Sequence, residues 1–440
     1  MLDEITGALK NRGGLAGWSV RHIRSSGVQV YAVPKGIESL RETDGEEYKI
    51  KVYSAGSGSQ GEATMGSGDS TVLPGGDIQA AIEHAALVAG LVLNPVYTLP
   101  GPGPLPQVEL VDPELERDMA GTMQAVMEKM RTAALKPGVR LTTAECFGEL
   151  QSIHLVNSRG VDARQEMTQV DAEFVLRAQK DGREVETFAE MTRRRASDLD
   201  MEAEIEQKLL YTLDLLEAGK PPPWQGPVVL RGQALAGFMA GDNLAGSVLG
   251  TLGSAESKYA MISSWEIGKP VFRGEVKGDP LTVWATRRLP FGTRSDCFDE
   301  EGLPAQRLEL IRENELVSFA ASQRYADYLG IAASGAFGGV ELPPGQTPAA
   351  VLLSEPHVEV IRFSWFNPDT ITGDFTSEIR FGYLVENGVR KPFTGGQLIG
   401  NYLEALANVR WSVETGFYGS YLGPHTARFE GLNLAGDEQG

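Results

Sequence analysis

This sequence of 440 residues has few of the side chains that bind metals or form disulfides: two cysteines, Cys146 and Cys297, and five histidines. Two cysteines are too few for a disulfide framework, as is typical of a reducing compartment. Long apolar runs are also missing: the longest, residues 85–93, is broken by Gly90 and covers about half of a membrane span. The N-terminus shows no signal-peptide pattern. We therefore expect a cytoplasmic protein without a membrane partner.

The sequence also has fewer basic than acidic side chains. The chain has 40 basic and 59 acidic side chains, a formal net charge of −19. Such a surface repels phosphate backbones, so we expect no direct nucleic-acid partner. The densest basic run, Arg193-Arg194-Arg195, lies close to Asp198 and Asp200 and is predicted to be a solvated surface.

The histidines are scattered, with no two within one or two helical turns of each other: His22, His84, His154, His357 and His425. A histidine such as His154, in a predicted strand, is more typical of packing or of a surface than of a metal site. His357 and His425 fall in predicted loops of one domain and could converge with Asp374 or Cys297 on an unrecognised hydrolase site. For Cys297, the neighbouring acids should raise the thiol pKa and weaken its nucleophilicity.

Cofactor motifs are lacking too. Residues 56–61 read G-x-G-x-x-G, but no helix is predicted to follow directly, so a flexible loop is favoured over a dinucleotide site. No Gly-Lys pair precedes Ser or Thr, which excludes a P-loop. Residues 294–302 gather four carboxylates without the spacing of an EF-hand. Solvated acids, or a turn with Gly302 at positive φ, are favoured there, and no cofactor is expected.

What is present predicts an α+β fold of three parts: antiparallel sheets with helices on one side, and a larger β-rich C-terminal domain. The predicted domains are residues 1–98, 107–220 and 226–440, separated by a Pro/Gly-rich linker at 99–106 and by Lys220-Pro221-Pro222-Pro223. Within the first two, we expect strands at 18–24 and 28–33 joined by a hairpin at 25–27, and helices at 77–93, 113–135 and 198–218.

The most regular local pattern lies at residues 373–409. Strand formers lead to Asn387-Gly388, which predicts a type I′ hairpin turn before a second strand at 389–393. Thr394-Gly395-Gly396-Gln397 then matches a capping box, which predicts a helix over 398–409.

Several motifs of this chain resemble those of the TldD/PmbA family, described as modulators of DNA gyrase and as a two-subunit protease. They are Gly-Asp-Phe-Thr from Gly373, Glu386-Asn387-Gly388, Gly400-Asn401, NSRGV at 157–161 and FDEEGLP at 298–304. The resemblance implies a zinc-binding partner, TldD, with His-Glu-x-x-x-His on a helix. At the similar position, in residues 235–247, this chain has Ala240-Gly241 and Ala245, none of which can bind zinc. It therefore resembles the PmbA (TldE) branch, which lacks the motif.

The resemblance implies that the chain is a zinc-less subunit of a cytoplasmic metalloprotease that processes or degrades small or unfolded peptides. Its partner would be a TldD-like zinc-bearing subunit or a second copy of itself. An extended peptide could pair with a strand edge, and the candidate surface consists of Gly373, Asp374, Phe375, Glu386, Asn387 and Gly388. A self-contained hydrolase and a non-catalytic peptide-binding or assembly protein remain as alternatives.

Overall fold

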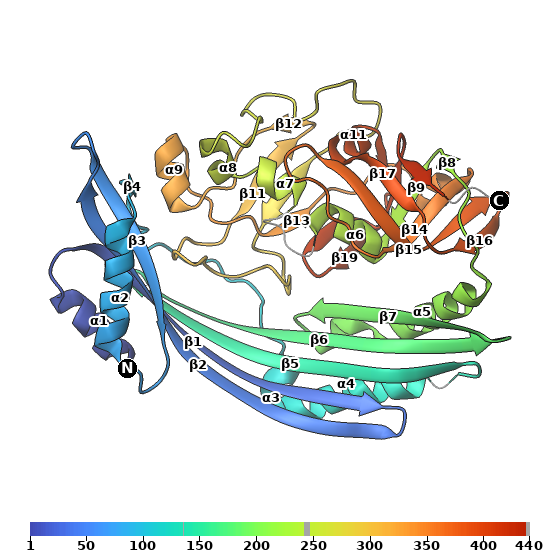
Figure 1. Ribbon diagram of the computed structural model, residues 1–440, viewed down its shortest axis with the longest axis horizontal. Helices are drawn as coiled ribbons and strands as arrows, with labels where there is room; N and C mark the ends of the chain where they lie inside the picture. Colours follow the sequence, from blue (N-terminus) through green and yellow to red (C-terminus); the bar gives the residue numbers. More distant parts are fainter. Residues whose placement is uncertain (135, 242–246, 437–440) are drawn as a thin grey trace.

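In the computed structural model, which describes residues 1–134, 136–241 and 247–436, a long curved sheet lies beneath a compact C-terminal domain (Figure 1). The predicted α+β class with a large β-rich C-terminal part is confirmed. None of the helices in these described ranges is long and apolar enough to cross a membrane.

The long sheet is antiparallel throughout and draws on both of the first two predicted domains. In spatial order its strands are β4 (Asn94–Pro95), β3 (Ala63–Val72), β2 (Gly36–Ser57), β1 (Leu15–Val33), β5 (Val139–Asn157), β6 (Asp162–Lys180) and β7 (Arg183–Arg193). Strand β1 pairs with β2 on one side and with β5 on the other. Residues 1–98 and 107–220 therefore share one continuous sheet.

The predicted hairpin at residues 25–27 is wrong, because β1 runs through it without a break. Ser25, Ser26 and Gly27 pair with residues 43–45 of β2 and with residues 149–151 of β5. A side chain at Gly27 would meet Thr43 and the Gly148 carbonyl. The glycine thus marks a close approach of neighbouring strands, not a turn.

Helices cover the sheet on one side, as alternating burial along its strands requires. α1 (Leu2–Asn11) and α2 (Ile78–Leu91) pack at one end, and α3 (Pro113–Arg117), α4 (Met119–Ala133) and α5 (Met201–Glu217) pack farther along, as Figure 1 shows. A short 3₁₀ turn, Ala196–Leu199, precedes α5. The predicted cap of α2 is confirmed, since the Asp77 carboxylate accepts a hydrogen bond from the Ala80 amide at 2.9 Å. The predicted helix over 113–135 is divided at Asp118, which ends α3 and caps α4 through the Gly121 amide.

The C-terminal domain contains two sheets around one core. The smaller has the order β12 (Glu315–Leu316), β11 (Arg307–Arg312), β10 (Val283–Thr286), β13 (Gly339–Glu341), β20 (Tyr421–Pro424) and β19 (Thr415–Tyr418). The larger has the order β18 (Val409–Trp411), β21 (Thr426–Phe429), β9 (Val228–Arg231), β14 (His357–Phe363), β15 (Asp374–Glu386), β17 (Gln397–Asn401), β22 (Asn433–Ala435) and β8 (Trp224–Gln225), with β16 (Val389–Phe393) also paired to β15. Its helices are α6 (Gly232–Ala240), α7 (Val248–Leu252), α8 (Ala255–Tyr259), α9 (Gln323–Leu329), α10 (Ala349–Leu352) and α11 (Tyr402–Ala407).

The β15–β16 hairpin confirms the predicted turn, because Asn387 and Gly388 both have positive φ, at 52° and 75°. The predicted capping box is wrong. Gly395 and Gly396 also have positive φ, and Gln397 begins strand β17, which pairs with the first half of β15. The helix starts only at Tyr402, where the Asn401 side chain accepts from two backbone amides.

Candidate functional site

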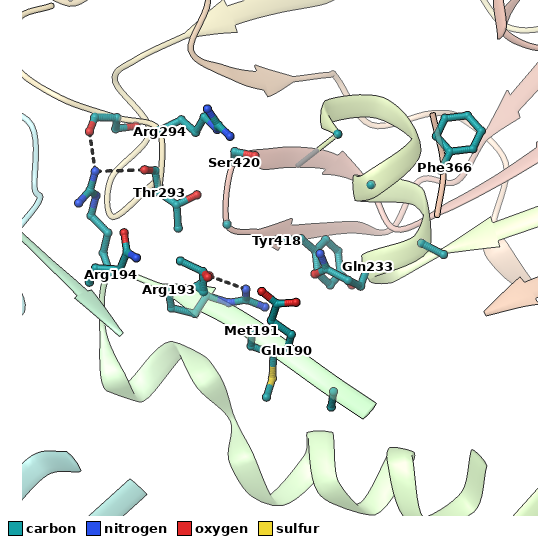
Figure 2. A pocket seen from close by; sticks show the side chains of 18 of the residues that line it. Glu190, Met191, Arg193, Arg194, Gln233, Thr293, Arg294, Phe366, Tyr418 and Ser420 are labelled. Carbon is teal, nitrogen blue, oxygen red and sulfur yellow. Dashed lines mark hydrogen bonds between the residues drawn. The ribbon is translucent and has the colours of Figure 1, made fainter. Parts of the chain in front are cut away.

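A cleft of about 1410 Å³ separates the long sheet from the C-terminal domain. Its floor comes from β1, β5, β6 and β7, and its roof from the start of α6, the loop at 293–296, β14, β15 and the turn between β19 and β20. Figure 2 shows Glu190 and Arg193 of β7 on one side of this space, with Gln233 and Tyr418 opposite. The cleft is large enough for a segment of peptide.

Helix α6 holds the region where the sequence predicted a degenerate zinc motif. It presents Gln233, Ala234 and Gly237 to the cleft, followed by Gly241 after its C-terminus. Ala240 is in the core and only 2% exposed, and Ala245 lies outside the described residues. This surface of α6 therefore presents no imidazole, thiolate or carboxylate. Across the described residues, no group of three or more His, Cys, Asp and Glu side chains is placed to hold a metal ion.

Strand β7 forms one wall of the cleft and is the last strand of its sheet, paired with β6 alone within the described chain. The Phe188 carbonyl accepts a hydrogen bond from the Arg362 guanidinium of the C-terminal domain, so it points away from β6. In an antiparallel pair, both backbone groups of alternate residues point to the same side. The amides and carbonyls of Glu186 and Glu190 therefore also point outward.

Arg194, just after β7, joins the sheet to the C-terminal domain. The residue is 5% exposed, and its guanidinium donates to four carbonyl oxygens, those of Thr168, Gly292, Thr293 and Ser295. Burial lowers the pKa of this guanidinium to about 10. The prediction that the basic run is a solvated surface is wrong for Arg193 and Arg194, because their surroundings come from segments distant in sequence.

The same contact between sheet and domain, which we call the seam (Arg194 with residues 287–303), contains a buried ion-pair network. The Arg287 guanidinium donates to Asp296 and lies 3.5 Å from Asp299. Burial raises the pKa of Asp296 to about 6, against the opposing effect of Arg287, and also raises the pKa of Asp299. The predicted positive φ of Gly302 is confirmed at 93°, but the expectation of solvated acids is wrong for Asp299, which is 6% exposed.

The predicted peptide surface lies elsewhere in the C-terminal domain. None of its residues lines the cleft in the part of the chain that is described: Gly373, Asp374, Phe375, Glu386, Asn387 and Gly388. Asp374 and Phe375 pair with β17, and the Asp374 carboxylate accepts from the Asn401 amide group at 2.9 Å. Glu386 pairs with Val389, and Asn387 and Gly388 form the hairpin tip. β15 itself is flanked by β14 on one side and by β16 and β17 on the other.

The histidines considered for a hydrolase site do not face the cleft. His357 is 1% exposed; its Nδ1–H donates to the Glu355 carbonyl at 2.8 Å, and burial lowers its pKa. His425 lies between β20 and β21, where burial lowers its pKa as well. The pKa of the Cys297 thiol is raised by burial first, with Asp296 adding to the effect. Neither histidine, nor Cys297, is among the described residues that line the cleft.

Of the glycine-rich residues 56–61, the first two end strand β2 and the others form the tight connection to β3. The Gly58 amide donates to the Glu62 carbonyl, and strand β3 follows. A dinucleotide fingerprint needs a helix at this point, so the preference for a connecting loop agrees with the structure.

The residues that the sequence did not indicate are those of β7 and of the roof opposite it. Phe188 and Arg362 are separated by 174 positions, and nothing local connects them. The one available signal was the alternation of Glu186, Phe188 and Glu190 along β7, which predicts one charged, exposed face on a strand.

Comparison with known proteins gives consistent results. Residues 226–436 match the model of the PmbA/TldA metallopeptidase C-terminal domain. An uncharacterised protein of Methanocaldococcus jannaschii is 26% identical over 288 residues, or 62% of this chain; the match spans 65% of that relative's length.

Two solved structures share the fold over almost the full length. A candidate modulator of DNA gyrase from Thermotoga maritima has a TM-score of 0.81 at 17% identity, with 99% of this chain and 100% of that chain covered. TldE from Thermococcus kodakarensis has a TM-score of 0.81 at 18% identity, with 99% of each chain covered. The C-terminal domain of this chain, residues 226–436, is therefore that of the PmbA/TldA family, and the whole chain shares the fold of these solved structures.

Proposed function

We propose that this chain is the zinc-less, peptide-holding subunit of a TldD/TldE-type peptidase. The observation that carries the proposal is the combination, in one cleft, of an open strand edge on β7 and of an α6 surface without metal ligands. The edge can hold a peptide, while hydrolysis requires a zinc-bearing partner. Small or unfolded peptides are the substrates that fit, since folded proteins rarely offer a free extended segment.

Strand β7 is better suited to this role than the β15–β16 hairpin. The outward backbone groups of Glu186 and Glu190 face the cleft, whereas β15 already has partners on both sides. A peptide added beside β7 would gain main-chain hydrogen bonds, which recognise an extended conformation more than a sequence. Because Glu190 lies on the exposed face of β7, a lysine or arginine opposite it in the peptide should pair with it across the strands.

A protein partner is supported by an apolar surface on the first part of the chain. Leu87 and Leu91 of α2 are 66% and 77% exposed, and Leu93 and Val96 continue the exposed surface after the helix. Several large apolar side chains exposed within ten positions of the chain are a feature of interaction sites. The partner would be a TldD-like subunit or a second copy of this chain.

A proline substitution tests the strand edge. Glu190→Pro removes an outward amide without removing a bond to β6, and edge strands tolerate proline. We expect it to weaken binding of a fluorescent, lysine-containing unfolded peptide by about tenfold, in fluorescence anisotropy, because it removes a main-chain hydrogen bond and blocks strand pairing. Glu190→Gln, which keeps the amide, is the matched control and should bind within about threefold of the unaltered chain. Equal binding by the proline and glutamine variants would overturn the assignment to β7.

The zinc-less role has a separate test. The purified chain alone should contain no stoichiometric zinc and cleave no peptide, and activity should appear when a TldD-like chain is added. One tightly held zinc per chain together with peptide cleavage by the chain alone would refute the proposal.

A further inference from the structure

Three cations from separate elements gather where β7 meets the cleft roof: Lys208 of α5, Arg362 of β14 and Arg380 of β15. We call them the cation cluster. Arg362 is paired in register with Phe381, the chain neighbour of Arg380. Burial lowers the pKa of Arg362 and of Lys208; repulsion by Arg380 lowers that of Arg362 further, and repulsion by Arg362 lowers that of Lys208 further. In a chain of net charge −19, this local excess of positive charge is unusual.

The cation cluster lacks carboxylate partners. Two other cations of the cleft do have carboxylate partners, since Arg21 pairs with Glu300 and Arg287 with Asp296. Within the described residues, by contrast, Lys208, Arg362 and Arg380 make no ion pair. The acids that oppose their repulsion, Glu204 near Lys208 and Glu190 near Arg362, act at a distance and form no salt bridge with them.

The contacts that do exist leave the charge uncompensated. Arg362 donates to the Phe188 carbonyl and lies over the Phe188 ring at 5.0 Å. The Lys208 ammonium lies 5.5 Å from the centre of the Tyr211 ring. Keeping like charges together in a partly buried place costs free energy unless an anion joins them. The planar guanidinium matches a carboxylate through two parallel hydrogen bonds.

The position of Arg362 also indicates which part of a peptide arrives there. A strand paired with β7 from the Glu190 side advances toward Phe188, whose carbonyl Arg362 already occupies. Pairing is obstructed at that point, so the end of the peptide comes to lie against the cation cluster. An α-ammonium would be repelled there and an α-carboxylate attracted.

We propose that Lys208, Arg362 and Arg380 form a carboxylate-binding site that takes the free C-terminus of a peptide lying along β7. The inference rests on the proposed peptide-holding function and adds to it a substrate class: peptides presented by their C-terminal end. A side-chain carboxylate at the last position is the other source of the same chemistry.

The test compares one lysine-containing unfolded peptide in three forms: C-terminal acid, C-terminal amide, and amide with aspartate as the last residue. Anisotropy titrations of the full chain should show the acid binding about tenfold more tightly than the amide, as one charge-assisted contact provides. Because the contact is electrostatic, this preference should shrink as salt is raised. Acid and amide binding with equal affinity would overturn the inference while leaving the proposed function intact. If neither form binds, the proposed function fails and the inference with it.

Variants locate the site. Arg362→Gln and Lys208→Gln should each reduce the acid-over-amide preference to about twofold or less, because each removes a positive charge that distinguishes the two peptide ends. Arg312→Gln, which removes the same charge from an exposed pair with Glu309, is the matched control and should keep the full preference. A preference retained in both cluster variants would overturn the assignment, as would its equal loss in the control. Recovery of affinity by the aspartate-ended amide would retain the site but contradict its assignment to the peptide terminus.

Discussion

Two groups of cations line the same cleft and differ in whether their charges and hydrogen bonds are satisfied within the chain. In the seam, Arg194 is buried against four carbonyl oxygens and Arg287 lies between two carboxylates. In the cation cluster, Lys208, Arg362 and Arg380 have no carboxylate partner in the described chain, and Arg362 donates to a single carbonyl oxygen, that of Phe188. A cation whose hydrogen bonds are satisfied within the chain holds two parts of the fold together. A cation left without a counter-charge costs stability and is explained better by a ligand. We therefore assign a structural role to the cations of the seam and a binding role to those of the cation cluster.

Of the variants that compare the seam with the cation cluster, Arg194→Ala is expected to change stability the most. The substitution removes a buried guanidinium that donates to the carbonyl oxygens of Thr293 and Ser295, so it should lower the free energy of unfolding by about 3 kcal/mol or more. Urea unfolding followed by circular dichroism measures this. The exposed Arg312→Ala should cost about 0.5 kcal/mol, and a comparable loss in both variants would contradict the structural role of the seam.

A smaller effect concerns pH. The pKa of Asp296 is raised from 3.8 to about 6 by burial, so the folded chain binds this proton more tightly than the unfolded chain does. The stabilisation from that proton is complete below about pH 4 and is lost as pH rises through about 6. Between these values the unaltered chain should lose about 2 kcal/mol relative to Asp296→Asn, by urea unfolding across the range. Parallel pH profiles for the two proteins would show that Asp296 is not held in its protonated form.

The smallest effect is expected in the cation cluster. Arg362→Gln loses a hydrogen bond to the Phe188 carbonyl but relieves repulsion by Arg380, so the free energy of unfolding should change by no more than about 0.5 kcal/mol. Thermal unfolding detects a difference of this size. A loss as large as that of Arg194→Ala would break the comparison, because Arg362 would then be a structural cation.

Features set by neighbouring residues could be predicted from the sequence. The Asn387-Gly388 turn follows from the need for positive φ at two successive positions, and the Asp77 cap from a carboxylate beside free amides. The same local reasoning failed at Ser25–Gly27 and at Thr394–Gln397. In both places, pairing with strands distant in sequence supplies the backbone hydrogen bonds.

The candidate site was less predictable for the same reason. Arg194 looked solvated because three of its four acceptors lie about a hundred positions later, at residues 292–295. Asp299 looked solvated because its partner Arg287 was not marked by any motif. The cation cluster combines positions 208, 362 and 380, and only the folded chain brings them together.

The long sheet contains strands from both sides of the linker at residues 99–106, and this determines where the polypeptide can be cut without separating its parts. The strands that precede this segment and those that follow it form two blocks of one sheet, joined where β1 pairs with β5, and the Asn157 side-chain amide donates to the Pro100 carbonyl at 2.8 Å. Cleavage of the backbone at the exposed Gly101 or Gly103 would cut the polypeptide but leave β1 hydrogen-bonded to β5. The two pieces should stay together on a native gel and come apart only in denaturant, so this position suits a split reporter and not the boundary of a truncated fragment.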